Sequence, residues 1–182
     1  MPPNLWFRLL VGFVALSAVT LGAMYVIGGR LPETQSASAT VSLDLTPEET
    51  FGRLADFERY PRSSLSVLAV ERDDDVNGLP EWREHMSQST ITWRTLVWDP
   101  PHRMVQRGVD SVVPQSTLWT FELTPEGDGT RLDVTIETTV SAGTWHVPIF
   151  RLLLKLGGTR VALEGYLVNT LPDFDADALH WH

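Results

Sequence analysis

The sequence predicts an α+β fold in which a curved antiparallel sheet of six to seven strands packs on a long C-terminal helix, preceded by an apolar N-terminal helix. Three observations predict it. The chain opens with an uncharged apolar block, its middle alternates strand-like runs with short turns, and its end carries leucines at helical spacing. The apolar stripe of such a helix must be buried, and a one-sided antiparallel sheet offers the partner surface.

Composition limits the classes of function. The chain has 182 residues, of which 43% are apolar, enough for one folded domain plus an additional segment. It contains no cysteine, so disulfide bonds, thiolate zinc sites and thiol nucleophiles are excluded. The formal net charge is -9, and the part after residue 30 is more acidic still, because Arg8 and Arg30 flank the first apolar block. Phosphate backbones and anionic lipid surfaces repel such a domain, and we expect no nucleic-acid partner.

The first element, residues 1–30, is predicted to be a single-pass membrane anchor. Residues 9–29 carry no charge, and as a helix they span about 32 Å, enough for a hydrocarbon core of about 30 Å. Trp6 and Tyr25 sit near the two ends, where amphipathic rings favour the membrane interface. The alternative is a cleaved signal peptide, whose apolar region would be only about 7–15 residues long.

The orientation of this anchor is weakly specified. Arg8 and the amino terminus precede the helix and Arg30 follows it, which favours an internal N-terminus and an extracytoplasmic domain, with the side left open. Residues 31–38 are polar and small and are predicted to form a linker. The folded domain is expected over 39–174, with a flexible tail over 175–182.

The domain begins with a strand and a helix. Residues 39–45 alternate between apolar and polar side chains and predict a half-buried strand. Thr46, Pro47 and Glu49 then form a capping-box pattern that starts a helix reaching about residue 55. Pro61 prevents a regular continuation, so "LADFERYP" is predicted to be a short second helical turn or an ordered loop.

Strand-like runs with local turns follow and predict an antiparallel meander. The run at 116–124 places Trp119, Phe121 and Leu123 on one face. The predicted strands of this region are 66–72, 81–87, 90–98, 102–109, 116–124 and 130–140.

The last element is a helix with an interruption. Its leucines are spaced 4, 7, 4 and 4 residues apart and predict a single stripe: Leu152, Leu156, Leu163, Leu167 and Leu171. "GGTR" at 157–160 interrupts it, and each glycine is about 1 kcal/mol less favourable than alanine inside a helix. The glycines mark either a kink between two helices or room for something packed against the helix.

Three segments carry a resemblance to a known family. "TPEETFGRLADFERYP" resembles the opening helices of the START-like superfamily, also called SRPBCC or the polyketide cyclase/dehydrase and lipid-transport family. "WDPPHRMVQR" resembles its proline-turn hairpin, and "EGDGTRLDVTIE" its last hairpin. The resemblance covers roughly residues 39–172 and implies a helix-grip fold. It also implies an apolar cavity between the sheet and the C-terminal helix, gated by the short second helix. The expected partner, bound in this cavity, is an apolar small molecule or lipid.

The predicted ligand-binding residues combine this resemblance with strand alternation. Phe57 and Tyr60 would cover the cavity mouth, or alternatively pack in the core. Arg107 shares a face with Val105 and Val109; facing inward it would need an acid or a ligand anion, and a register shift would expose it. The predicted set is Phe57, Tyr60, Trp93, Arg107, Trp119, Phe121, Ile136, Leu156 and Gly157.

Tryptophans add further candidates for the cavity wall. Trp93, Trp119 and Trp145 would line it, and the alternative is that they fill a solid core. Trp82 and Trp98 fit either face of their strands.

No catalytic residue, metal site or cofactor is predicted. The histidines show no ligand spacing, and the terminal "HWH" at 180–182 would at most bind a metal weakly or fray. Nucleophile-elbow, P-loop and dinucleotide motifs are absent from the sequence.

Three functions therefore stay open. The first is membrane-tethered binding of a hydrophobic molecule in the cavity. The second is a cyclase- or dehydratase-like enzyme, for which Glu84, His85, Arg107 and Tyr166 are the titratable candidates. The third is a protein-interaction module with a solid core and no cavity.

Overall fold

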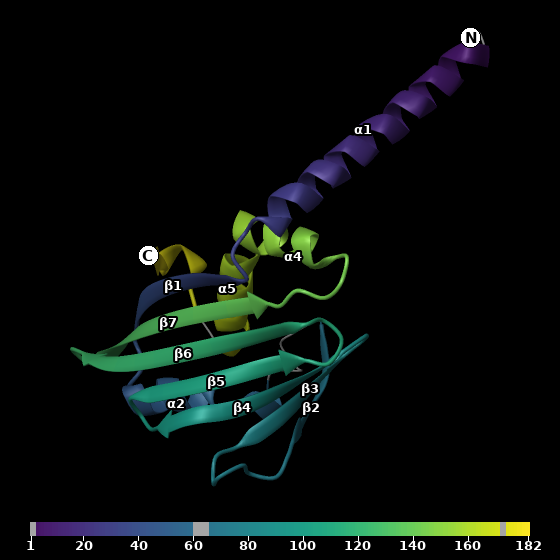
Figure 1. Cartoon of the computed structure of the whole chain (residues 1–182). Helices are drawn as coiled ribbons and strands as arrows, with labels where there is room; N and C mark the ends of the chain where they lie inside the picture. Colours follow the sequence, from purple (N-terminus) through teal and green to yellow (C-terminus); the bar gives the residue numbers. More distant parts are fainter. Residues whose placement is uncertain (1–2, 60–65, 172–173) are drawn as a thin grey trace.

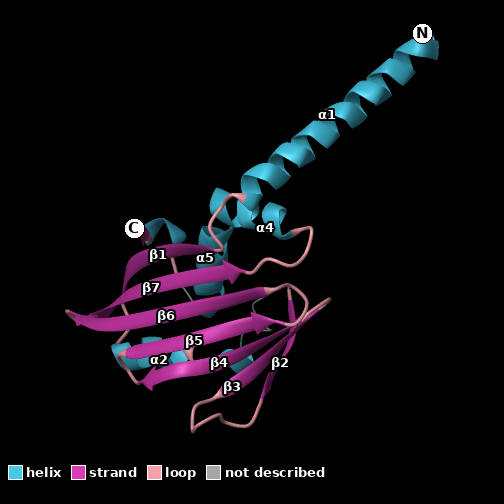
Figure 2. Cartoon of the chain, viewed as in Figure 1, coloured by secondary structure: helices cyan, strands magenta, loops and turns pink. Residues whose placement is uncertain are grey.

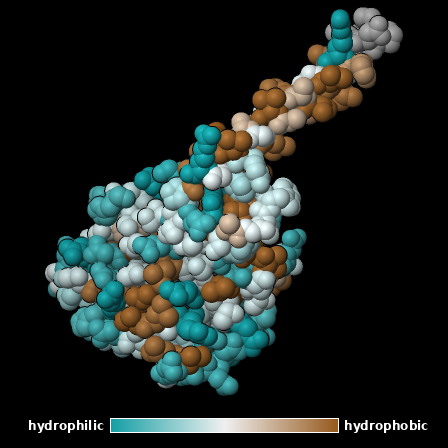
Figure 3. Space-filling model, viewed as in Figure 1, coloured by the Kyte–Doolittle hydropathy of each residue, from teal (hydrophilic) through white to brown (hydrophobic). Residues whose placement is uncertain are grey.

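The structure is a computed structural model that describes residues 3–59, 66–171 and 174–182. Helix α1 (Pro3–Gly29) projects from an α+β body that holds all the other elements (Figure 1). Within the described residues, one stretch, Trp6–Gly29, is long and apolar enough to cross a membrane. Figure 3 shows α1 as a largely apolar rod, whereas the visible face of the body mixes hydrophilic and hydrophobic residues.

The body is built on an eight-stranded antiparallel sheet with the order β2-β3-β4-β5-β6-β7-β1-β8. Strands β2 to β7 follow one another as hairpins, and β1 returns to pair with β7, which confirms the predicted antiparallel meander. The strands are β1 (Thr34–Leu43), β2 (Val67–Arg72), β3 (Glu81–Met86), β4 (Thr90–Asp99), β5 (Arg103–Asp110), β6 (Gln115–Glu126), β7 (Gly129–Val140) and β8 (His180–Trp181).

Both ends of the domain are more ordered than the sequence predicted. Strand β1 begins at Thr34, so most of the expected linker is strand, because Ala37 and Ala39 are buried against β7. The last residues of the expected tail also form a strand. Strand β8 pairs with β1, and the buried Leu179 holds it there. The edge of β1 that does not face β7 offers backbone N–H and C=O groups, and a short strand can form hydrogen bonds with them.

The helices cover one face of the curved sheet (Figure 2). The predicted capping box is present, since the Glu49 backbone N–H donates to Thr46 Oγ1 and the Thr46 N–H donates to Glu49 Oε2, both at 3.2 Å. The helical elements are α2 (Pro47–Leu54), the 3₁₀ turn η1 (Phe57–Arg59), α4 (Val147–Leu153), the π turn η2 (Leu154–Gly158), α5 (Thr159–Thr170) and the 3₁₀ turn η3 (Ala176–Ala178).

The C-terminal helix is kinked, and the predicted leucine stripe divides there. Leu163, Leu167 and Leu171 are fully buried against the sheet, whereas Leu156 is 72% exposed. Gly157 has a φ of 121°, a conformation that favours glycine, so the chain changes direction between α4 and α5. The placement of Leu156 on the buried stripe is therefore wrong, and the interpretation of "GGTR" as a kink is correct.

Helix α4 joins the end of α1 to the sheet. A Cβ at Gly28 would overlap the carbonyl oxygen of Pro148, so the two helices meet at backbone distance. The buried Arg151 donates from Nη2 and Nε to the Val140 carbonyl, at 2.7 and 3.1 Å, and from Nη2 to Glu33 Oε1 at 2.9 Å. These contacts hold α4 between the base of α1 and the end of β7.

Candidate functional site

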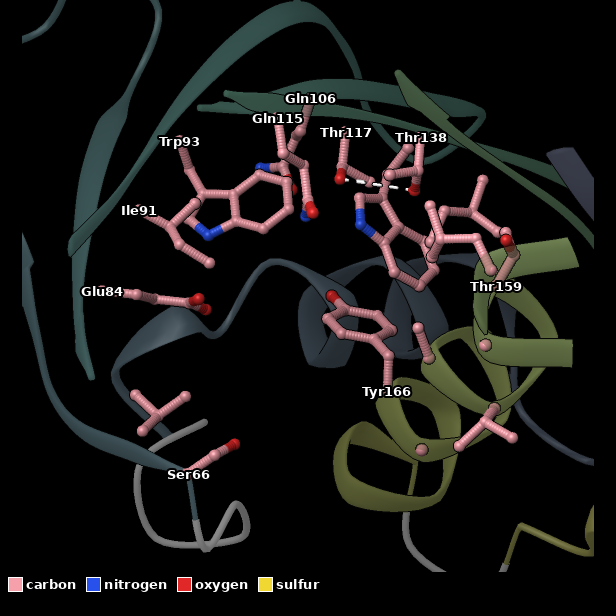
Figure 4. A pocket seen from close by; sticks show the side chains of 18 of the residues that line it. Ser66, Glu84, Ile91, Trp93, Gln106, Gln115, Thr117, Thr138, Thr159 and Tyr166 are labelled. Atoms are coloured by element: carbon pink, nitrogen blue, oxygen red, sulfur yellow. Dashed lines mark hydrogen bonds between the residues drawn. The ribbon is translucent and has the colours of Figure 1, made fainter. Parts of the chain in front are cut away.

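A cavity of about 520 Å³ lies between the concave face of the sheet and the C-terminal helices. Its size lies within the range of about 300–1,000 Å³ that is usual for small-molecule sites. Figure 4 shows the sheet residues Glu84, Trp93, Gln106 and Gln115 facing Tyr166 of α5 across it. This cavity argues against the third hypothesis, a protein-interaction module without a cavity, because that hypothesis required a solid core.

One wall of the cavity is aromatic. Trp119 and Phe121 alternate on β6, and their rings stack with centroids 5.7 Å apart and an interplanar angle of 5°. Tyr166 approaches from α5 with its ring centroid 4.8 Å from that of Trp119. Its hydroxyl donates to the Leu54 carbonyl at 3.2 Å, so Tyr166 also ties α5 to α2. Rings in such arrangements give a rigid apolar surface.

A neighbouring part of the lining is polar. Thr117 and Thr138 lie on paired strands, with their hydroxyls 3.4 Å apart. Gln106 Nε2 and Thr159 Oγ1 are buried and have no hydrogen-bond partner within the part of the chain that the structure describes. Because buried polar groups are normally satisfied, these two atoms are available to a ligand that carries oxygen or nitrogen.

Glu84 is the acidic group of the cavity lining. It projects from β3 into the cavity, and burial raises the pKa of its carboxyl group. The indole N–H of Trp93 is oriented toward this carboxyl without reaching hydrogen-bonding geometry, so it offsets only part of the effect. A raised pKa favours the neutral form of this carboxyl, and the neutral form is the one that can donate a hydrogen bond or a proton to a bound molecule.

Five of the predicted site residues line this cavity: Phe57, Trp93, Trp119, Phe121 and Ile136. Phe57 belongs to η1, is buried and packs on Trp82 with ring centroids 5.1 Å apart, so it lines the cavity as a packed residue, and its role at the mouth stays a prediction. Tyr60 lies outside the described residues.

Arg107 was placed in the cavity, and this placement is wrong. On β5 the side chains that face the helices are those of Met104 and Gln106, whereas Arg107 is exposed on the outer face. Both faces of this strand carry apolar residues, so alternation alone left its register ambiguous. Gln106 takes the inward position that the prediction gave to Arg107.

Three further placements need correction. Leu156 and Gly157 do not line the cavity but border a separate surface hollow beside Gln35 of β1, because the kink turns them away from the cavity. Trp145 is 75% exposed in the turn before α4 and is no part of the cavity wall.

Sequence reasoning missed several polar lining residues, chiefly Gln106, Thr159 and Asn169. A signal for Gln106 was present, since it lies two residues from both Met104 and Gly108, which share its face. Thr159 and Asn169 follow the kink, whose geometry the sequence did not specify.

The histidines do not gather into a metal site. Among the described residues, no three His, Asp or Glu side chains are placed to hold a metal ion. His85 Nε2 lies 3.3 Å from Glu71 Oε2 on neighbouring strands. His182 is not frayed, because its Nε2 lies 3.0 Å from Thr40 Oγ1.

A curved antiparallel sheet closed over a ligand-sized cavity by a C-terminal helix defines a helix-grip, START-like domain. The family model described as "Polyketide cyclase / dehydrase and lipid transport" matches residues 34–166, and the chain belongs to this family. A search of curated proteins returns no match.

Solved structures share the fold at low sequence identity. The di-domain aromatase/cyclase StfQ from the steffimycin biosynthetic pathway has a TM-score of 0.58 at 12% identity; the match covers 74% of this chain but only 48% of StfQ. The Zhui aromatase/cyclase from a Streptomyces species also has a TM-score of 0.58, at 18% identity, covering 74% of this chain and 92% of its own. A START superfamily protein from Mycobacterium smegmatis has a TM-score of 0.50 at 17% identity, covering 70% and 97%. At these identities the likeness shows the fold alone.

Proposed function

We propose that this protein binds a hydrophobic small molecule or lipid in the cavity between sheet and C-terminal helix, while α1 anchors it in a membrane. The observation that carries the proposal is the combination of a rigid aromatic wall with three unsatisfied buried polar atoms of the described residues in one cavity, on Trp93, Gln106 and Thr159. Burying apolar ligand surface contributes about 25 cal/mol per Å², and the polar groups would orient the ligand. A ligand with a long apolar body and one or two oxygen atoms fits both features.

The anchoring part rests on α1. Its apolar stretch ends at Gly29, and β1 begins at Thr34, so the domain would stay within a few residues of the bilayer. A hydrophobic ligand is concentrated in the bilayer rather than in water, so a short tether would keep the cavity close to its ligand. The charge pattern favours an extracytoplasmic domain, and this side remains part of the proposal.

The test is a variant that fills the cavity without disturbing the fold. Gly165 lines the cavity on α5, and a Cβ there would meet nothing within 4 Å, so Gly165→Leu places a large side chain in the cavity and improves helix propensity. Gly52→Leu on α2 is the matched control, since Gly52 is exposed and also has nothing within 4 Å.

The readout is native mass spectrometry of the full chain released from detergent, together with titration by the fluorescent fatty acid cis-parinaric acid. We expect a co-purifying apolar adduct in the parent and in Gly52→Leu, and its loss in Gly165→Leu. Equal probe affinity and equal adduct in both variants would refute binding in this cavity.

A second function, acid–base catalysis of the cyclase or dehydratase kind, is favoured by Glu84 alone. Its carboxyl faces the cavity with a raised pKa, the property that a general acid needs near neutral pH. Glu84→Gln keeps the shape and the hydrogen-bonding capacity but cannot exchange a proton. Incubation with a poly-β-ketone thioester should give a cyclised or dehydrated product with the parent and none with the variant; absence of product from both would leave binding as the function.

A further inference from the structure

Exposed large apolar side chains gather on one continuous segment of the body. We call residues 145–161 the docking face; it comprises the end of the turn before α4, α4 itself, the π turn and the first residues of α5. Its exposed members are Trp145, Leu153, Leu156 and Val161, each at least 51% accessible. Of the described residues outside α1, the other exposed large hydrophobics are dispersed over β2, β4, β5, the turn after β5 and the end of α5.

The charges of this segment differ from those of the rest of the protein. Residues 138–163 contain no Asp or Glu, the longest such stretch after residue 32 in a chain with 23 acidic residues. The same stretch carries Arg151, Lys155 and Arg160. Arg151 is paired with Glu33. Lys155 and Arg160 are left as the charges of the segment without an ion pair among the described residues, so the repulsion from anionic lipid that the net charge predicts is weakest here.

The docking face lies at the base of α1. Gly28 and Pro148 meet at backbone distance, and Tyr25 borders the same surface hollow as Trp145. Tyr25 is about one turn from the end of α1, the depth at which tyrosine and tryptophan prefer the membrane interface. In Figure 1, α4 and the turn before it lie directly beside this end of α1.

The cavity opens at the same place. Leu153 and Val161 both line the cavity and are exposed, so they border an opening of it on this side; Ser66, also exposed, lines the cavity on the β2 side. Leu153 is five residues from Pro148, about 7.5 Å along the axis of α4, and Pro148 touches the base of α1. The opening on this side is therefore held close to the level at which α1 would leave the membrane.

We propose that the docking face binds the surface of the lipid bilayer in which α1 is anchored, with Trp145 and Leu156 inserted among the headgroups. The opening on this side of the cavity then meets the bilayer, and a hydrophobic ligand passes between them without crossing water. The proposal rests on the anchoring proposed above. An apolar patch of this kind, which carries Lys155 and Arg160 and whose Arg151 is paired with Glu33, suits a lipid surface better than an acidic or polar protein partner.

The absence of cysteine allows a direct test, because one introduced cysteine is the only labelling site. Trp145→Cys and Leu156→Cys are prepared in the full chain, labelled with the fluorophore NBD, and inserted in nanodiscs of phosphatidylcholine and phosphatidylglycerol. Asp74→Cys is the control, since it is exposed in the β2–β3 turn at the end of the body away from α1 (Figure 1). Quenching is measured with aqueous iodide and with lipid that carries a nitroxide near its headgroup.

We expect the labels at 145 and 156 to be quenched about twofold or more strongly by the nitroxide lipid than the label at 74, with the reverse order for iodide. Labels at all three positions that respond equally to iodide and not to the nitroxide lipid would overturn the proposal. That result would leave cavity binding intact, because the Gly165→Leu comparison is made in detergent without a bilayer.

A kinetic measurement tests the consequence for exchange. Leu156→Glu adds an acidic residue to the docking face at a position that does not line the cavity. Transfer of cis-parinaric acid from the nanodisc bilayer into the cavity should slow about fivefold, with unchanged affinity in detergent. Unchanged transfer rates would contradict docking, and a loss of affinity in detergent would mean that residue 156 acts on the cavity itself.

Discussion

Trp93 on β4 lies directly opposite Gly108 on β5, and its indole ring occupies the space that a side chain at residue 108 would fill. A Cβ at Gly108 would stand 2.6 Å from the nearest ring carbon. The ring therefore lies flat over the neighbouring strand and forms part of the cavity wall. A small residue on one strand decides where a large residue on the next one sits.

Gly108→Ala is expected to force the Trp93 ring out of this position. The indole is rigid, so the overlap cannot be relieved by a small rotation, and overpacking of this kind costs about 1–3 kcal/mol of stability. Thermal unfolding and cis-parinaric acid titration measure the two effects, and both stability and affinity should fall. In a Trp93→Leu background, Gly108→Ala should reduce stability much less than in the parent. Strictly additive losses of stability would contradict the direct contact.

Glu84 predicts a specific dependence of stability on pH. Burial raises its folded-state pKa above the ordinary value of 4.5, so the unfolded chain loses this proton first as the pH rises. The contribution of this residue to stability is complete below pH 4.5 and is lost as the pH rises through the folded-state pKa. Glu84→Gln should therefore be more stable than the parent at neutral pH and equal to it in acid. Urea unfolding across this pH range measures the difference in unfolding free energy between the variant and the parent. A difference that does not change with pH would rule out the effect.

Two leucines of the predicted stripe should respond very differently to the same substitution. Leu163 is fully buried beneath the sheet, so Leu163→Ala is expected to cost about 2–5 kcal/mol. Leu156 lies beyond the kink and is exposed, so Leu156→Ala should change stability by no more than about 0.5 kcal/mol. Chemical denaturation of both variants makes the comparison, and similar losses would argue for one continuous helix.

Arg151 should matter more through its carbonyl contacts than through its ion pair. Arg151→Ala leaves the Val140 carbonyl without its two donated hydrogen bonds, a loss of about 1–3 kcal/mol. Glu33 is largely exposed, so Glu33→Gln should cost at most about 1 kcal/mol. Unfolding free energies at low and high salt distinguish the two contributions. A larger loss for Glu33→Gln would reverse this ranking.

Local patterns were sufficient for the order of the elements. The capping box at Thr46 and Glu49 requires only neighbouring residues, and the structure contains it. The alternation of Trp119, Phe121 and Leu123 likewise places these side chains on one face of a strand, and all three are buried. Such signals are readable because the interactions that produce them span only a few positions in the chain.

Other features depended on how the elements meet. Alternation shows that Val105, Arg107 and Val109 share a face, but packing of the helices on the opposite face is what leaves Arg107 and Val109 exposed. In the same way, Gly157 was recognisable as an interruption, whereas the direction of the turn, which separates Leu156 from Leu163, is a property of the folded chain. Which face of a strand or helix is buried depends on elements that are distant in the sequence.

The sequence by itself thus determined an apolar helix, an antiparallel meander and a C-terminal helix with an interruption, because each follows from the period of its own residues. Only the tertiary structure decided which face of each strand lines the cavity, that Glu84 is buried in it, and that α4 and Trp145 lie beside the base of α1. The physical reason is that burial and its effect on a carboxyl group come from the surfaces brought together on folding. Periodicity identifies the apolar face of each helix or strand, but not the element that packs on that face.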